Sequence, residues 1–321
     1  MPITSFKTGT KSRSMLIGNE AYIPLGFRAI FSGGYTNTQI NVIQYVNIAT
    51  IGNTTDFGDL TQARDNSFGN VSSTTRGLHA GGTAPSYVNT IDYITIATTG
   101  NAIDFGDLTG TNRSGGAASS STRGLYFGGY NGSSLVTTID YVTIASTGNA
   151  TNFGNTNASG YVGAAVSSTT RACQGGGYNG SSHIANIDYV TIATTGNAAN
   201  FGNLTQNRSS LNGAMGSNTR GIYSGGNTGG TYYDIIDYIT IASTGNATDF
   251  GDLLVAYSSA GATSSPTRGL IAGGFPSNGL PVNVIQYVTI DTTGNATDFG
   301  DLLAATSAPV GNSNGHGGLA V

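Results

Sequence analysis

The chain repeats nearly the same run of about 48 residues six times, and this repetition constrains its fold more than any other feature. Each copy has an arginine that begins a strand ending near Gly-Gly, an Ile-Asp-Tyr or Ile-Gln-Tyr strand, and a phenylalanine in a run such as Thr-Gly-Asn-Ala-Thr-Asp-Phe-Gly-Asp-Leu. The three recurring residues are Arg28, Arg76, Arg123, Arg171, Arg220 and Arg268; Tyr45, Tyr93, Tyr141, Tyr189, Tyr238 and Tyr287; and Phe57, Phe105, Phe153, Phe201, Phe250 and Phe299. A period of this length, with strand-like segments and no helical pattern, predicts an all-β propeller with one four-stranded antiparallel blade per copy.

The order of strands can be read within a single copy. In the third copy, strands are expected at 124–127, 139–145, 150–153 and 161–166, with Gly-Asn as the hairpin turn between the second and third of these. A further copy of the segment that supplies the innermost strand, 305–311, follows the sixth unit, so we expect it to pair with the first blade and close a six-bladed ring (Velcro closure). The alternative is a seventh, composite blade built from 15–23 and 317–321.

These boundaries divide the chain into an N-terminal arm, 1–27, and a propeller, 28–321. The arm matches no repeat and holds both lysines of the chain, so propeller folding does not explain its sequence. We therefore expect it to attach the protein to a partner through Lys7, Lys11, Arg13, Met15, Leu16 and Ile17.

Composition excludes several classes of partner. Charged residues make up 9% of the chain and the net charge is −4, with no basic stripe, so we expect no nucleic-acid binding. The arm has only a three-residue apolar run, too short for a signal peptide, and nothing long enough to enter a membrane. The single cysteine, Cys173, occupies a position where other copies have Leu or Ile, and it is interpreted as a buried apolar residue.

No catalytic or cofactor-binding constellation emerges from the sequence. His79, His183 and His316 lie far apart and lack partners at metal-ligand spacing, so we expect no metal site and no cofactor. The Asp-Phe-Gly-Asp runs become Asn-Phe-Gly-Asn in two copies, which argues against calcium loops; their side chains are expected to bond turn amides, and some to meet the repeated arginines. Arg64, Arg113 and Arg208 are interpreted as a second repeated, structural position.

The repeat resembles known families. Arginine, an apolar strand, Gly-Gly, an Asp-Tyr strand and a late aromatic residue, over 28 to about 315, resemble the Kelch repeat, although phenylalanine stands where that family usually has tryptophan. The wording Ile-Asp-Tyr-Val-Thr-Ile-Ala-Thr-Thr-Gly-Asn-Ala-Thr-Asp-Phe-Gly-Asp-Leu is similar to repeat-rich structural proteins of tailed phages that infect marine cyanobacteria and related bacteria. This resemblance implies a virion component, assembled in the host cytoplasm, and brings no catalytic residues.

Comparison of the copies with one another points to one face. We number the strands of a blade from the inside of the ring, so that 124–127, 139–145 and 150–153 are strands 2, 3 and 4, and a segment such as 161–166 is strand 1 of the next blade. With this numbering, the turns between strands 1 and 2 and between strands 3 and 4 barely vary, whereas the strand 2–3 loops differ from copy to copy and carry aromatic side chains. Strand connectivity predicts that these loops share one face of the disc, and variable loops on a rigid frame favour recognition, with unconstrained drift as the alternative. The predicted recognition residues are Tyr35, Tyr87, Tyr130, Tyr178, His183, Tyr232, Tyr233 and Phe275.

The expected function is therefore a non-enzymatic virion protein of a tailed phage, a decoration or adhesion module of the tail, baseplate or fibre. Its expected partners are other virion proteins, bound through the arm, and a host surface glycan or protein, bound through the variable loops. The alternative is a cellular carbohydrate-active enzyme or lectin on a Kelch-like propeller.

Overall fold

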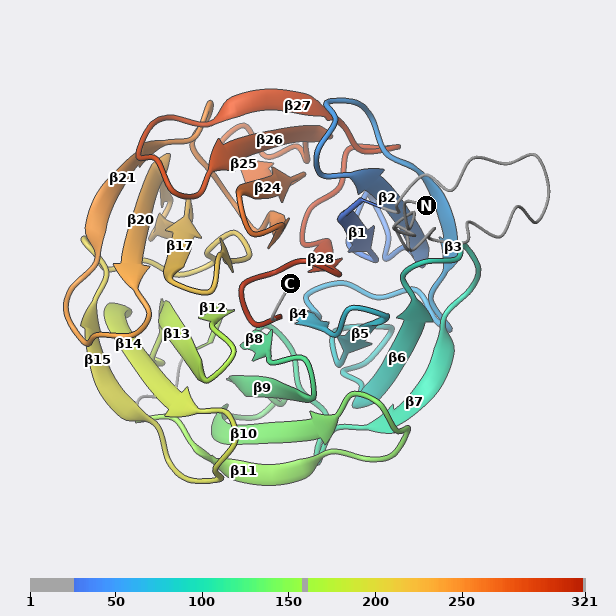
Figure 1. Cartoon of the computed structure of the whole chain (residues 1–321), viewed down its shortest axis with the longest axis horizontal. Coiled ribbons are helices and arrows are strands. Elements are labelled where there is room, and N and C mark those ends of the chain that lie inside the picture. Colours follow the sequence, from blue (N-terminus) through green and yellow to red (C-terminus); the bar gives the residue numbers. More distant parts are fainter. Residues whose placement is uncertain (1–25, 158–160, 320–321) are drawn as a thin grey trace, which may run out of the picture.

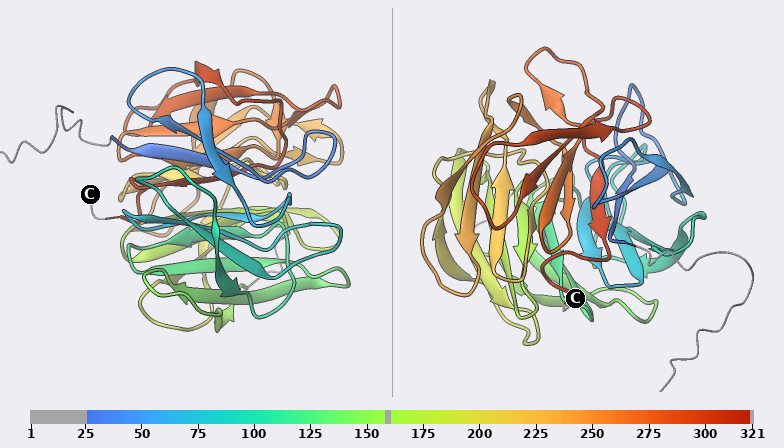
Figure 2. Two further views of the ribbon diagram at one scale, coloured as in Figure 1. Left: turned by 90° about the vertical axis from the view of Figure 1, so that its right-hand side faces the viewer. Right: turned by 45° about the horizontal axis from the view of Figure 1, so that its top comes forward.

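The computed structural model describes residues 26–157 and 161–319. Six four-stranded antiparallel sheets surround a central axis like the blades of a propeller, and their strands run between the two faces of the disc (Figures 1 and 2). This confirms the six-bladed, all-β prediction over the seven-bladed alternative. No helix that could cross a membrane occurs in these two described ranges.

For each blade, the strands are named in order from the innermost strand, at the central axis, to the outermost strand. Blade 1 comprises β28 (Val310–Ser313), β1 (Arg28–Ser32), β2 (Val42–Asn47) and β3 (Thr55–Asp59). Blade 2 comprises β4 (Phe68–Ser72), β5 (Arg76–Ala80), β6 (Thr90–Thr95) and β7 (Ile103–Asp107). Blade 3 comprises β8 (Gly116–Ser119), β9 (Arg123–Tyr130), β10 (Leu135–Thr143) and β11 (Thr151–Asn155).

Blade 4 comprises β12 (Ala164–Ser167), β13 (Arg171–Tyr178), β14 (His183–Thr191) and β15 (Ala199–Asn203). Blade 5 comprises β16 (Met215–Gly216), β17 (Arg220–Ser224), β20 (Ile235–Thr240) and β21 (Thr248–Asp252). Blade 6 comprises β23 (Gly261–Ser264), β24 (Arg268–Ala272), β26 (Val284–Thr289) and β27 (Thr297–Asp301). Two short pairs lie outside the blades: β18 (Asn227–Thr228) with β19 (Thr231–Tyr232), and β22 (Tyr257–Ser258) with β25 (Phe275–Pro276).

Blade 1 combines strands from both ends of the described chain. β28 pairs antiparallel with β1, with Ala29 opposite Ser313 and Ser32 opposite Val310. Pairing the last strand with the first removes the open edge that a linear array of blades would expose. Phe27, which was assigned to the arm, packs against the core shared by blades 6 and 1. The proposed seventh-blade segment 15–23 lies outside the described residues.

The repeated Arg-Tyr-Phe set forms one contact unit per blade. Each arginine places its guanidinium 4.3–4.7 Å from the ring centre of its own blade's tyrosine, and that ring meets the phenylalanine edge-on at 5.8–6.1 Å. The same guanidinium donates a hydrogen bond of 2.8–3.0 Å to an isoleucine carbonyl of the next blade, and Arg268 to Ile48 completes the ring. These six arginines therefore join neighbouring blades, and within the described ranges none of them pairs with an acid; the ion pairs that occur involve the second repeated position, Arg64 with Asp92 and Arg208 with Asp237.

The Gly-Asn turn of each blade is hydrogen-bonded to the outer strand of the preceding blade. Asn101 Oδ1, for example, accepts a hydrogen bond from the Asp59 amide at 3.0 Å, and the equivalent contact recurs at every blade boundary. A Cβ on Gly58 would lie 2.5 Å from the Gly100 carbonyl oxygen, so this close approach requires glycine. The prediction that the Asp-Phe-Gly-Asp side chains bond turn amides is wrong: within the described ranges, the carboxylates of Asp56, Asp104, Asp249 and Asp298 have no hydrogen-bond partner, and the turn asparagines bind the amides.

Candidate functional site

The strand 2–3 loops and the strand 4–1 loops meet on one face of the disc, as the sequence predicted; we call it the loop face, and the opposite side the turn face. In all six blades the residue after the Gly-Gly pair forms an antiparallel bridge with a residue of the neighbouring strand 4–1 loop. The six bridges are Tyr35–Ser307, Thr83–Asp65, Tyr130–Arg113, Tyr178–Tyr161, Asn227–Ser209 and Phe275–Ser258. The backbone around the axis is thus constant while its side chains vary.

The inner members of these bridges differ sharply in size between the two halves of the ring. Asp65, Arg113 and Tyr161 follow one another on one half, and Ser209, Ser258 and Ser307 occupy the same structural position on the other. A cavity of about 350 Å³, which we call the cup, is lined by Ser258 and Ser307 of the serine half and is bordered by Asp65. We call the half that carries Asp65, Arg113 and Tyr161 the filled half.

The cup brings together three of the predicted recognition residues, Tyr35, Tyr232 and Phe275. Tyr35 is 38% exposed, and the other two are half-buried. The remaining lining is small and polar: Asp65, Asn66, Ser210, Asn227, Ser258, Ser259, Ser307 and Ala308. Aromatic rings beside hydroxyl and amide groups form a surface suited to a ligand with both apolar faces and hydrogen-bonding groups.

The floor of the cup is a ring of residues with left-handed backbone. Asn66, Ser114, Val162, Ser210, Ser259 and Ala308 have φ between 49° and 57°. Amides around the axis donate to carbonyls of the preceding blade, for example Ser114 N to Asn66 O at 2.8 Å and Ser259 N to Ser210 O at 3.0 Å. This conformation is unfavourable for non-glycine residues, above all for the β-branched Val162.

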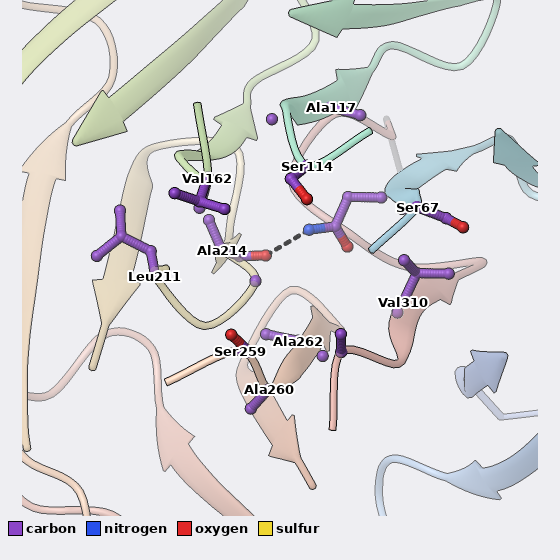
Figure 3. A pocket seen from close by; sticks show the side chains of 18 of the residues that line it. Ser67, Ser114, Ala117, Val162, Leu211, Ala214, Ser259, Ala260, Ala262 and Val310 are labelled. Carbon is purple, nitrogen blue, oxygen red and sulfur yellow. Dashed lines mark hydrogen bonds between the residues drawn. The ribbon is translucent and has the colours of Figure 1, made fainter. Parts of the chain in front are cut away.

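The channel below the floor is blocked twice. A second cavity, of about 100 Å³, shares Asn66, Ser210 and Ser259 with the cup. Across it, Asn70 Nδ2 donates a hydrogen bond of 2.7 Å to the Ala214 carbonyl oxygen, the dashed line in Figure 3. Nearer the turn face, His316 is buried against Ser119 Oγ at 3.2 Å and Ser72 O at 3.3 Å. A ligand that binds at the central axis therefore reaches the cup from the loop face.

The other predicted residues lie on the filled half of the loop face or beside it. Tyr87 and Tyr130 pack edge-on with ring centres 6.0 Å apart, and Tyr178 lies 5.3 Å from the His183 ring. His183 is held between Ser209 Oγ at 2.9 Å and the Gly229 amide at 3.1 Å, so it supports the neighbouring loop. That loop is the β18–β19 hairpin, whose two turn residues, Gly229 and Gly230, both have positive φ.

Tyr233 differs from its neighbour Tyr232. Its hydroxyl forms a hydrogen bond of 2.7 Å with Thr228 Oγ1 and its amide donates to the Gly226 carbonyl, so Tyr233 stabilises the hairpin. Tyr232, by contrast, lines the cup. The predicted attachment residues Lys7, Lys11, Arg13, Met15, Leu16 and Ile17 lie outside the described residues.

Sequence reasoning missed Asp65, Arg113 and Tyr161 as residues of this face. Arg64 and Arg208 are equivalent: each is fully buried and paired with an acid of the next blade, Asp92 at 2.8 Å and Asp237 at 2.9 Å. Arg113 is one residue further along the repeat, in the position of Asp65, so its interpretation as a third member of that structural set is wrong. The sequence does contain a signal for this shift, because Arg64 and Arg208 stand four positions after Leu60 and Leu204, whereas Arg113 stands five after Leu108.

Asp65 is the carboxylate that lines the cup. Burial raises the pKa of Asp65, although a hydrogen bond involving Asn66 and the positive charge of Arg113 act in the opposite direction. Burial also raises the pKa of Tyr161, against the influence of Arg113. Asp65 is buried, and its Oδ1 has no hydrogen-bond partner among the described residues, so it is a strong acceptor for ligand hydroxyl or amine groups.

No group of three or more His, Cys, Asp or Glu side chains placed to hold a metal ion occurs among the described residues. Comparison of the sequence with models of protein families gave no match, and comparison with curated proteins found none that is similar.

Proposed function

We propose that the protein is a non-enzymatic adhesion or decoration module of a tailed-phage particle, and that it binds a host surface glycan or protein through the cup. The observation that carries the binding role is the cup itself: a constant backbone ring that places Tyr35, Tyr232 and Phe275 around a polar cavity of about 350 Å³. The repeat sequence is similar to that of phage structural proteins, which supports the assignment to a virion. The order of its recurring residue types resembles the Kelch repeat, which supports the family assignment.

Binding to host cells tests the role of the cup. Tyr232→Ala removes a lining ring without touching the hairpin bond of Tyr233, and it should weaken binding by about 2 kcal/mol, the scale of an interface hot spot. Ser121→Ala, in an exposed turn on the turn face, is the matched control and should leave binding unchanged. If the residues that line the cup can be substituted without loss of binding, the differences between the loops reflect unconstrained sequence drift and not recognition.

Virion membership and attachment have their own tests. Mass spectrometry of purified particles should detect this chain, and its absence would refute the assignment. In addition, a protein that begins near Pro24 should fold and still fail to join particles, because we assign attachment to the arm. Normal incorporation of that truncated protein would show that the arm is dispensable.

One observation favours an enzyme as the second candidate: the raised pKa of Asp65 in the cup, as expected for a general acid. Glycoside hydrolysis ordinarily requires a pair of carboxylates, and among the described residues that line the cup Asp65 is the only acid. Turnover of a glycan by the native protein that Asp65→Asn abolishes would overturn the non-enzymatic proposal.

A further inference from the structure

Arg113 is held in an unusual way on the filled half of the loop face. Its guanidinium carbon lies 4.9 Å, 5.8 Å and 5.4 Å from the ring centres of Tyr87, Tyr130 and Tyr161. We call these four residues the arginine cage. The rings also contact one another, Tyr130 with Tyr87 at 6.0 Å and with Tyr161 at 5.7 Å, so the cage is one packed cluster drawn from three blades.

The side chain of Arg113 makes no hydrogen bond within the described ranges. Every other arginine in the described part of the chain donates a side-chain hydrogen bond to a carbonyl or a carboxylate. Arg113 donates none within those ranges, forms no ion pair there, and has its Nε closed off from solvent without a partner. An arginine with unpaired, partly desolvated N–H groups is costly unless a further acceptor satisfies them.

Contact with the three rings is compatible with such an acceptor. Aromatic rings contact the faces of a guanidinium, whereas its N–H donors point outward in its plane, so stacking and in-plane binding of an anion are compatible. A planar carboxylate matches the two-pronged arrangement of those donors. We propose that the arginine cage binds the carboxylate of an acidic saccharide whose neighbouring sugar rings occupy the cup; the inference rests on the proposed binding role of the loop face.

Two features select this ligand class. Asp65, the next ring position to Arg113, carries a charge that interacts with the guanidinium and would repel a doubly charged phosphate more than a singly charged carboxylate. Asp65 also lines the cup, whose rings and hydroxyl groups suit sugars rather than a highly charged chain. A uronic-acid saccharide combines one carboxylate per ring with hydroxyl groups.

Calorimetric titration with trigalacturonate and with its fully methyl-esterified form tests the proposal, because esterification removes the charge and keeps the sugar. The acid should bind about 10-fold or more tightly than the ester, and Arg113→Gln should abolish that difference. Arg113→Lys should recover little of it, since an ammonium lacks the planar pair of donors. Asp65→Asn should instead strengthen binding of the acid. Equal binding of acid and ester, or an unchanged affinity in Arg113→Gln, would overturn the proposal.

A second readout covers the case in which Arg113→Gln does not fold. In ¹H–¹⁵N spectra of the native protein, the Arg113 Nε–H signal, assigned by its loss in Arg113→Lys, should shift on addition of trigalacturonate and not of the ester. No shift would count against the cage, and equal competition by a triglutamate peptide would replace the saccharide by an acidic protein segment. Loss of trigalacturonate binding in Tyr232→Ala but not in Arg113 variants would leave the proposed function standing and refute the cage, whereas binding that survives both changes would refute both.

Discussion

The side-chain amide of Asn70 donates a 2.7 Å hydrogen bond across the central channel to the carbonyl oxygen of Ala214, and so joins blade 2 to blade 5 through the axis. Asn70 has φ of 60°, which glycine also adopts, so Asn70→Gly removes this bond without straining the backbone. We expect the free energy of unfolding in urea to fall by about 1 kcal/mol.

Ser259→Gly is the matched control for Asn70→Gly, because Ser259 also has positive φ, lines the same cavity, and has a side chain without a hydrogen bond in the described part of the chain. It should not destabilise the protein. Equal effects of the two substitutions would show that the cross-channel bond contributes nothing.

Arg123 represents the six arginines that connect neighbouring blades. It donates to the Ile192 carbonyl at 2.8 Å and lies 4.5 Å from the Tyr141 ring centre. Arg123→Met should cost about 2 kcal/mol in the free energy of unfolding, since a hydrogen bond and a cation–π contact are lost together. The free energy of unfolding of Arg123→Lys should lie between those of the native protein and of Arg123→Met. If Arg123→Met were as stable as the native protein, Arg123 would not stabilise the contact between blades.

The acids of the third strands offer a matched pair of substitutions. Asp237 is fully buried and paired with Arg208, whereas Asp140 accepts hydrogen bonds from Thr109 and has no arginine partner in the described ranges. Asp237→Asn should cost about 3–5 kcal/mol, because it leaves Arg208 buried without a counter-charge. Asp140→Asn should cost about 1 kcal/mol. Similar losses in urea unfolding would show that the ion pair has no special weight.

Burial lowers the pKa of His316 to about 4, against an ordinary value of 6.5. The unfolded chain therefore binds a proton between these pH values while the folded protein does not, so stability is complete above pH 6.5 and falls as the pH is lowered toward about 4. The loss from this group amounts to about 3 kcal/mol. Burial lowers the pKa of His79 in the same direction.

Urea unfolding measured from pH 7 to pH 4 checks this dependence. His316→Gln cannot bind the proton and should show a shallower loss of stability, the remainder coming from His79. An identical pH profile for the variant would exclude His316 as a contributor.

Cys173 is fully buried, as the sequence predicted, and burial raises the pKa of its thiol to about 12. It should react with a thiol reagent such as Ellman's reagent only at the rate of unfolding, because both access and thiolate are lacking in the folded protein. Cys173→Val should change the free energy of unfolding by less than about 1 kcal/mol. Rapid labelling under native conditions would contradict the buried placement.

The blade was predictable because its main contacts recur with the repeat. Arg123 contacts Tyr141 and the next blade, and the equivalent residues make the same two contacts in the other five blades. Six copies of one sequence pattern therefore all indicate the same blade structure. The strand order and the shared face of the variable loops follow from that blade structure through antiparallel connectivity. The candidate site was predictable only in part: Tyr35, Tyr232 and Phe275 were found from loop variation, but Asp65 and Arg113 were not, since a one-residue shift made Arg113 look like Arg64.

The sequence by itself determined the repeat period, the four-stranded blade and its strand order, because those features recur in each copy, and it favoured six blades with seven as the alternative. The tertiary structure alone decided which half of the loop face opens into the cup and that Asn70 and His316 block the channel. These are single contacts between residues as far apart as 144 and 197 positions, and they depend on side-chain volumes around one axis. A contact that occurs only once produces no repeated pattern in the sequence, so it can be seen only in the closed ring of the tertiary structure.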